Sequence, residues 1–239
     1  MTWKYFLTSS VGKKLVMGGT GIFLILFLVV HVGLNACIWA NDNGAMFNKA
    51  AYFMGKTVVP RILEIGLFVG FFIHIIQGYL LTVQNQQRRK IGYAVIYGNR
   101  GSKWYSRSMG ILGTLILMFL VMHIYHFWTP SRFGGDWGIH ELQLVNYPPD
   151  PRQYHNLYHE MMVVFQTPLI VALYVAGCIS LAYHLAHGFQ SAFKTMGVHN
   201  NRYVAMLRTT GYIFAVVVPL AFAMMPVSIY FGWIQEVLI

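Results

Sequence analysis

The chain has few charged residues. Only 10% of its 239 residues are Asp, Glu, Lys or Arg, and seven of these are acidic. A soluble globular chain carries about 25% charged residues, and a disordered chain is poor in hydrophobic ones. Here 56% of the residues are hydrophobic and the mean hydropathy is +0.53. The composition therefore excludes both classes and predicts an integral membrane protein.

Cysteine is also scarce. The two cysteines, Cys37 and Cys178, lie inside long apolar runs and far from each other in the sequence. A disulfide framework or a zinc site would need cysteines at closer, regular spacing, so both are expected to be packing residues. No internal repeat or low-complexity stretch stands out, which argues against a repeat architecture.

Long windows without charge define the membrane spans, because a charged side chain near the bilayer centre costs about 2.5 to 3.5 kcal/mol. Five windows exceed the roughly 20 residues that a helix needs to cross the hydrocarbon. They are 15–41, 65–87, 108–131, 161–193 and 209–235. The second helix is expected to begin near Val58, because Pro60 suits a first helical turn.

The predicted fold is an all-α integral membrane protein with five transmembrane helices in a single domain that covers residues 1–239. The predicted helices are about 15–40, 58–86, 108–129, 166–190 and 209–235. This set is long enough for a four-helix bundle with a fifth helix beside it.

Basic residues are concentrated in the connections on one side of these spans. The N-terminal segment, the second connection and the fourth connection hold three, six and three of them, which is 12 of the 17, and no acid. Because positive charge stays on the cytoplasmic side, the N-terminus is predicted to be cytoplasmic in a multi-pass protein of the cytoplasmic membrane. This topology accounts for the net charge of +10 without nucleic acid, and the basic face would also suit an acidic protein partner.

Four of the five spans carry a histidine deep inside the apolar run. These are His31, His74, His123 and His184. An imidazole in hydrocarbon is costly unless it has a partner, so such residues are expected to be functional. A neighbouring helix could satisfy one of them. Four on four separate helices favour a shared role, for which haem ligation is the economical explanation.

The depths of these histidines fall at two levels. Relative to the centres of their spans, His31 and His123 lie toward the outer side, and His74 and His184 lie toward the inner side. The levels differ by about eight residues, or roughly 12 Å at 1.5 Å per residue. This spacing accommodates two haems stacked in a four-helix bundle. The expected axial ligands are His31 with His123 for the outer iron and His74 with His184 for the inner iron.

Rows of small residues at helical spacing surround the inner pair. The rows are Gly66, Gly70 and Gly78 about His74, and Gly177, Ser180 and Gly188 about His184. Such rows would leave room for a flat macrocycle, although helix contact without a cofactor uses the same pattern. The outer pair lacks small residues one turn before its histidines, where Phe27 and Phe119 stand instead.

Two further histidines compete for the ligand positions. His126 lies one turn beyond His123, and His187 lies one turn beyond His184. Both approach the membrane interface, where aromatic and polar side chains gather. We favour His123 and His184 as the ligands, and we expect His126 and His187 near haem propionates.

Another histidine pair lies in the long outer connection. His155 and His159 are spaced i, i+4 beside Glu160, a pattern that a metal site could use. A hydrated entrance to the fourth helix is the favoured explanation, because the surrounding connection is polar.

Three segments carry a resemblance to a known family. They are Ser9-Ser10-Val11-Gly12-Lys13-Lys14, Leu63-Glu64-Ile65-Gly66-Leu67-Phe68 and Tyr183-His184-Leu185-Ala186-His187-Gly188. With the order of helices and histidines, the chain resembles the cytochrome b subunit of succinate:quinone oxidoreductases, in the five-helix, two-haem branch that includes fumarate reductases. The resemblance covers nearly the whole chain, and the family's ligand positions match the same four histidines in the same pairs.

This resemblance implies a membrane anchor that binds a flavoprotein subunit and an iron-sulfur subunit on its cytoplasmic face. Electrons would pass between succinate or fumarate chemistry in those partners, two haem b groups and a quinone of the respiratory chain. The chain itself would not touch the dicarboxylate. The two-haem branch implies menaquinone as the quinone.

A quinone needs hydrogen-bond partners for its two carbonyls and a proton route to water. The candidates for this route are Glu64 at the outer end of the second helix and His155, His159 or Glu160 at the entrance of the fourth. A structural role at the interface suits Glu64 equally well. On the inner side, five basic residues are candidates for haem propionates or partner docking, although topology alone explains each of them. They are Arg88, Arg89, Lys90, Arg107 and Lys194.

Two other interpretations stay open. The chain could be the two-haem cytochrome b anchor of a hydrogenase or a formate dehydrogenase, in which case the purified complex would contain nickel or molybdenum. It could instead be a haem-free proton or ion transporter that uses its intramembrane histidines. The purified chain would then show no Soret band.

Overall fold

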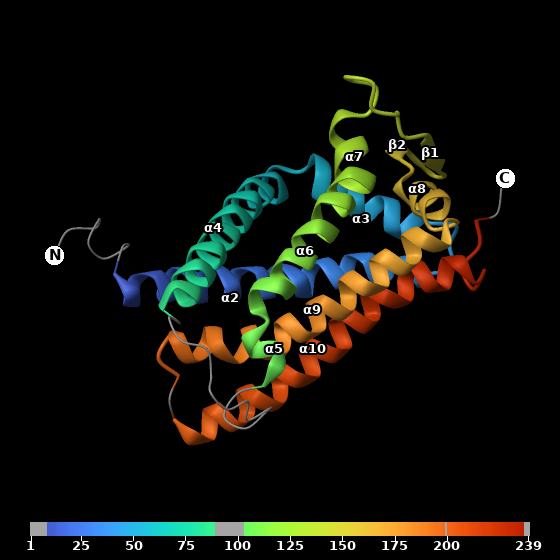
Figure 1. Ribbon diagram of the computed structural model, residues 1–239. Coiled ribbons are helices and arrows are strands. Elements are labelled where there is room, and N and C mark those ends of the chain that lie inside the picture. The colour runs from blue at the N-terminus through green and yellow to red at the C-terminus, as the bar shows by residue number, and fades with distance from the viewer. Residues whose placement is uncertain (1–8, 89–102, 199, 237–239) are drawn as a thin grey trace. The chain divides into compact units, whose positions relative to one another are not determined.

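The computed structural model describes residues 9–88, 103–198 and 200–236, and 79% of these residues are helical. Within these residues, five helical segments are long and apolar enough to cross a membrane, as the sequence predicts (Figure 1). They are Ser10–Trp39, Val58–Gln87, Met109–Phe133, Pro168–Thr195 and Asn201–Tyr230. The protein is therefore a helical, multi-pass membrane protein.

Each span is built from one or more helical elements, and the α-helices among them are labelled in Figure 1. The spans consist of α2 (Ser10–Asn35) with the 3₁₀ turn η1 (Ala36–Trp39), α4 (Val58–Arg88), α6 (Met109–His123) with the π turn η2 (Ile124–Trp128) and α7 (Thr129–Phe133), α9 (Pro168–Thr195), and α10 (Asn201–Tyr230). Between the spans lie α3 (Ala45–Lys56), α5 (Trp104–Arg107), β1 (Leu144–Tyr147), β2 (Asp150–His155) and α8 (Leu157–Val164).

The first and last spans begin earlier than their charge-free windows. α2 starts after Ser9, whose hydroxyl accepts a hydrogen bond from the amide of Gly12 at 3.0 Å. α10 starts after Asn200, whose side chain accepts from the amide of Arg202 at 2.9 Å. A side chain that caps the first turn starts a helix even where charged residues follow. Charge-free windows therefore locate the apolar part of these helices but not their first residues.

The last span also ends at Tyr230, before the predicted residue 235. Gly232 follows with a φ of 69°, and its amide donates to the carbonyl of Ile229 at 3.0 Å. A glycine in the left-handed region just past the last turn is a common helix stop.

The third span contains the π turn η2, which follows directly on His123. In a regular α-helix the amide of residue 130 would donate to the carbonyl of His126. Pro130 has no amide hydrogen, so this hydrogen bond is missing. The hydroxyl of Thr129 donates to the carbonyl of Ile124 at 3.0 Å. π turns are rare in proteins as a whole, but those that occur inside α-helices often lie at functional sites. This one carries His126.

The long connection between the third and fourth spans contains a two-stranded antiparallel hairpin, β1–β2, that the sequence does not predict. At its turn Tyr147 pairs with Asp150. Asn48 of α3, which is 1% exposed, fastens the hairpin to its neighbours. The Asn48 amide donates to the Tyr147 hydroxyl and to Asn156 Oδ1, each at 2.8 Å, and its oxygen accepts from the amide of Tyr158 at 3.0 Å. Long-range side-chain bonds of this kind leave no periodic signal in the sequence.

Contacts between Cα atoms divide the chain into two compact units, and we describe each by itself. Unit 1 comprises Met1–Leu28, Ile65–Leu115 and Ser180–Val217, and unit 2 comprises Val29–Glu64, Ile116–Ile179 and Val218–Ile239. The buried core of unit 1 includes Ile25, Leu185, Phe189 and Ala215. The buried core of unit 2 includes Ile38, Phe47, Tyr158, Met161, Met162, Phe165, Val171, Tyr174, Met225 and Ile229. The expectation of a single domain stays a prediction.

Candidate functional site

In unit 2, the imidazole rings of His31 and His123 lie close together. His31 is on α2, and His123 is the last residue of α6. Their ring centroids are 5.8 Å apart and the ring planes cross at 85°. His123 Nδ1 is buried and has no hydrogen-bond partner among the described residues. The side-chain nitrogen of Asn35 donates to the main-chain oxygen of His31 at 2.8 Å and lies 3.3 Å from its Nδ1.

Aromatic side chains surround this pair. Phe119 stacks on His123 with centroids 5.6 Å apart and planes at 21°. Tyr174 meets the His123 ring edge-on at 6.1 Å, and Phe222 lies 5.4 Å from the ring of His31. These rings form an apolar environment that disfavours water next to the imidazoles.

Gly177 packs near the His31–His123 pair, and not against His184 as its place in the predicted row suggests. A Cβ on Gly177 would lie 2.6 Å from the ring of Phe119, far closer than side-chain carbons approach each other. The glycine on α9 therefore makes room for Phe119 on α6, the residue that stacks on His123.

In unit 1, His74 of α4 and His184 of α9 form a second pair. Their ring centroids are 6.3 Å apart and the planes cross at 61°. His184 Nδ1 is buried and has no hydrogen-bond partner among the described residues. His74 Nδ1 differs, because it lies 3.1 Å from the hydroxyl oxygen of Thr20.

Glycines of two further helices lie against these rings. A Cβ on Gly21 would be 3.7 Å from His74 Cε1, and a Cβ on Gly113 would be 3.9 Å from His184 Cε1. The sequence did not reveal either glycine, because the predicted rows of small residues follow the helices that carry His74 and His184. A glycine at matching depth on α2 or α6 is the signal that could have found them.

The predicted small residues beside the inner pair have different neighbours. A Cβ on Gly70 or Gly78 would meet side chains of α2, at 2.9 Å and 3.5 Å respectively. A Cβ on Gly188 would lie 3.9 Å from His184 Cδ2, and Ser180 is 7% exposed. Gly70 therefore allows close helix packing, whereas Gly188 lies beside the ring of His184.

Each histidine pair has the spacing of two imidazoles that share one metal ion. A metal–imidazole bond is about 2 Å long and the ring centre lies roughly 1 Å farther, so rings on opposite sides of one ion have centroids about 6 Å apart. The observed distances are 5.8 Å and 6.3 Å. The described residues contain no group of three or more His, Cys, Asp or Glu that could hold an ion. Each pair thus offers two protein ligands.

The competing histidines have other surroundings. His126, in the π turn, has its Nδ1 3.0 Å from the hydroxyl of Tyr174, and the two rings stack at 5.9 Å. The ring of Tyr174 also contacts His123, so one tyrosine joins His126 to the outer pair. His187 is half-buried on α9, one turn after His184.

Glu64 is held by three side chains of unit 2. Arg132 donates to both carboxylate oxygens, from Nε at 3.0 Å and from a terminal nitrogen at 2.9 Å. The Trp128 indole donates at 2.6 Å, and Arg61 donates at 3.0 Å. A bidentate guanidinium contact is a strong and directional ion pair, which favours a structural role for this carboxylate.

His155, His159 and Glu160 do not share one site. His159 Nδ1 lies 2.6 Å from a carboxylate oxygen of Glu236, and Glu160 lies 3.1 Å from Nε2 of His140. His155 instead borders a small pocket of unit 2. The metal site that their spacing suggests is therefore not assembled.

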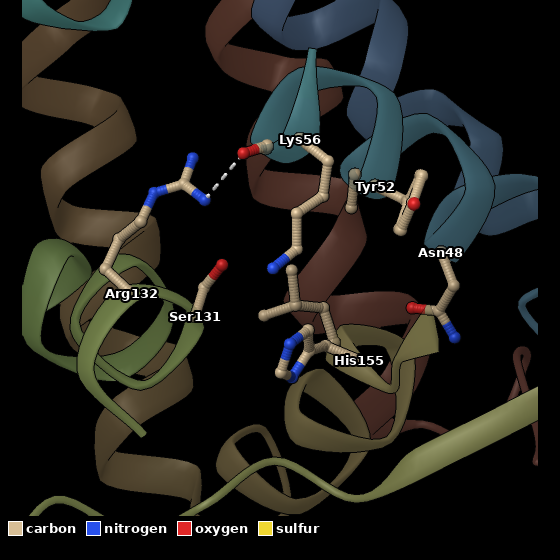
Figure 2. A pocket seen from close by; sticks show the side chains of 9 residues that line it. Asn48, Tyr52, Lys56, Ser131, Arg132 and His155 are labelled. Atoms are coloured by element: carbon tan, nitrogen blue, oxygen red, sulfur yellow. Dashed lines mark hydrogen bonds between the residues drawn. The ribbon is translucent and has the colours of Figure 1, made fainter. Parts of the chain in front are cut away.

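The pocket beside His155 is lined by both polar and apolar residues, and the basic side chains of Lys56 and Arg132 are among them (Figure 2). Its lining residues are Asn48, Ala51, Tyr52, Gly55, Lys56, Ser131, Arg132, His155 and Leu157. Within the described residues, His155 Nδ1 is buried without a hydrogen-bond partner. Burial lowers the pKa of His155, and the charges of Lys56 and Arg132 lower it further. His155 is therefore neutral at pH 7 and can serve as a hydrogen-bond donor or acceptor.

Comparison with known proteins gives one informative match. No family model and no solved structure matches the chain. Over 181 residues the chain is 23% identical to the succinate dehydrogenase cytochrome b558 subunit of Bacillus subtilis (strain 168). This chain is a homologue of that subunit. The match covers 74% of this chain and 73% of the relative, so the resemblance predicted from the three segments is confirmed.

Two of the five predicted inner basic residues can be located with their side chains. Arg107 ends α5, and Lys194 lies in the last turn of α9. Arg89 and Lys90 lie outside the described residues, and of Arg88 only the helical backbone is described. Their role toward propionates or partners stays a prediction.

Proposed function

We propose that this protein is the membrane-anchoring cytochrome b subunit of a succinate:quinone oxidoreductase and that it holds two haem b groups. The proposal rests on the two histidine pairs, one in each unit, whose ring centroids are 5.8 Å and 6.3 Å apart. Homology to a succinate dehydrogenase cytochrome b subunit supports both the complex and the haem type.

The residues around both histidine pairs fit a haem bound between two imidazoles. His31 with His123, and His74 with His184, would bind the two irons. Two imidazoles leave no open coordination position, which favours electron transfer over oxygen chemistry. A haem supplies one-electron oxidation and reduction when bound. The task of the chain is then to orient the ligand rings and to exclude water, which the aromatic side chains around the His31–His123 pair are suited to do.

A flavoprotein subunit and an iron-sulfur subunit are the proposed partners, on the cytoplasmic face. The relative is named as a subunit of succinate dehydrogenase. The connections that topology assigns to this face hold 12 of the 17 basic residues, which favours both this orientation and an acidic partner surface. In this arrangement the dicarboxylate reacts in the partners, and this chain anchors them and carries electrons.

The proposed electron carrier in the membrane is a quinone, and family resemblance favours menaquinone. Of the four outer candidates, His155 is the one with an uncommitted hydrogen-bonding atom for a quinone carbonyl, because it borders a pocket and its Nδ1 has no partner among the described residues. Glu64, His159 and Glu160 are each engaged by another side chain.

Dithionite-reduced difference spectra of the purified protein test the proposal. The wild type should show two b-type haems per chain. One haem should be lost in each of four variants: His31→Ala, His74→Ala, His123→Ala and His184→Ala. His126→Ala and His187→Ala are the controls and should keep both. A folded but colourless protein would overturn the proposal in favour of a transporter, and nickel or molybdenum in the complex would favour a hydrogenase or formate dehydrogenase anchor.

A further inference from the structure

We infer that Thr20 is a positioning residue for His74. Its hydroxyl oxygen accepts the Nδ1 proton of the imidazole, which leaves Nε2 as the ring atom that binds iron. The inference rests on the proposed function and adds to it the residue that sets the tautomer and the donor strength of one ligand.

The hydrogen bonds around Thr20 determine the direction of this contact. The Thr20 hydroxyl lies 2.8 Å from the carbonyl oxygen of Val16 and 3.2 Å from that of Met17. It lies 3.1 Å from His74 Nδ1. Because a carbonyl oxygen can only accept, the single hydroxyl proton points back to the helix and a lone pair faces the imidazole. His74 Nδ1 must then carry a proton, and Nε2 has its lone pair free.

The neighbour of Thr20 in the sequence also lies beside the ring. A Cβ on Gly21 would lie 3.7 Å from His74 Cε1, which is an ordinary van der Waals distance. Thr20 and Gly21 of α2 thus both lie beside the imidazole of α4. The other histidine of this pair lacks a matching hydrogen bond within the described residues, because His184 Nδ1 is buried without a partner.

The hydrogen bond has a consequence for the redox potential of the metal. A ligand imidazole that donates its outer N–H to an acceptor is oriented by it and becomes more basic at the coordinating nitrogen. A more basic ligand favours the oxidised iron, which carries the additional positive charge, and so lowers the midpoint potential. Removing the acceptor should raise that potential at this centre alone.

The size of the effect follows from the strength of one hydrogen bond. A neutral hydrogen bond corresponds to about a fivefold change in an equilibrium constant. For a one-electron couple, a fivefold change in the ratio of oxidised to reduced centre is roughly 40 mV, at 59 mV per tenfold change. Shifts of this size are resolved by spectroscopic redox titration.

The test is a redox titration of the haem-loaded protein with three substitutions. Thr20→Val keeps the volume of the side chain and removes the acceptor, and it should raise the potential of one haem by roughly 40 mV. Thr20→Ser keeps the hydroxyl and should titrate as the wild type. Thr114→Val is the matched control, because the exposed Thr114 makes the same kind of bond to its own helix, at 2.9 Å to Gly110. His31→Ala should retain only the haem between His74 and His184. The midpoint potential measured in that variant therefore identifies the His74 centre.

Two results would overturn the inference without touching the proposed function: unchanged potentials in Thr20→Val with both haems bound, or a Thr20→Ser protein that behaves as Thr20→Val. If Thr20→Val loses the haem of this centre, a Thr20→Ser protein that retains it at the wild-type potential supports the inference. A wild-type protein without haem would instead overturn the proposed function itself.

Discussion

The ring of Phe119 packs directly against the backbone of Gly177. A Cβ on the glycine would lie 2.6 Å from a ring carbon, and Phe119 in turn stacks on His123 at 5.6 Å. Small residues at a helix contact let two backbones approach closely. Here that approach of α6 and α9 determines where the aromatic partner of the His123 imidazole lies.

Gly177→Ala should therefore destabilise unit 2. The added methyl group forces Phe119 away from His123, and overpacking of this kind costs about 1–3 kcal/mol. Thermal unfolding of the detergent-purified protein, followed by circular dichroism, measures the loss. Gly33→Ala is the control, because a Cβ on Gly33 has nothing within 4 Å. Equal melting temperatures of the two variants would contradict the packing explanation.

Glu64→Gln should lower stability by on the order of 1–3 kcal/mol, since it leaves the guanidinium of Arg132 without its counter-charge. The side chains of Glu64 and Arg132 are both only 16% exposed. Arg61→Gln is the control, because Arg61 is 49% exposed and a surface pair contributes less than about 1 kcal/mol. Melting temperatures compare the two.

The same Glu64→Gln variant separates two roles of the carboxylate. If the role is structural, the variant should have a lower melting temperature. Its rate of quinone reduction should then fall only in proportion to the fraction of protein that is folded. Loss of quinone reduction at an unchanged melting temperature would show instead that Glu64 acts on the quinone.

Stability should fall on acidification because of His155. Its pKa in the folded protein is lowered by burial and by the charges of Lys56 and Arg132. The unfolded chain, with an ordinary histidine pKa of about 6.5, therefore takes up a proton that the folded protein does not. The contribution is fully present above this value and is lost as the pH falls below it.

Melting temperatures between pH 7.5 and pH 5 measure this dependence. His155→Gln should have a flatter profile than the wild type. Lys56→Gln should flatten the profile less, because burial is the larger cause of the shift. A His155→Gln profile as steep as that of the wild type would refute the assignment.

Asn48→Ala should destabilise the outer connection more than any substitution on its surface. The change removes three hydrogen bonds that join α3, the hairpin and α8, and each buried polar group left unsatisfied costs about 1–3 kcal/mol. Asn146→Ala, an exposed position in β1, is the control and should stay within about 0.5 kcal/mol of the wild type. Limited proteolysis in the connection 134–156 gives the local readout, and equal cleavage rates in the two variants would oppose the prediction.

Much of the architecture could be predicted because its causes are local. The cost of a charge in hydrocarbon acts on each residue separately, so charge-free windows found five spans, and Pro60 marked the first turn of α4. Depth along a helix is also local, since each residue adds about 1.5 Å. Depth therefore suggested which histidine rings would be neighbours, and the structure brings together His31 with His123 and His74 with His184. The hairpin and the side-chain bonds of Asn48 depend on distant residues, and the sequence did not reveal them.

The sequence by itself determined a basic, helical membrane protein with four histidines inside its spans, because hydropathy and helical rise depend only on residue order. Tertiary structure alone decided that Thr20 meets His74, that Gly177 admits Phe119, and that Glu64 is held by Arg132. The rotation of each helix about its axis is set by packing against residues distant in the chain, and composition carries no record of that rotation.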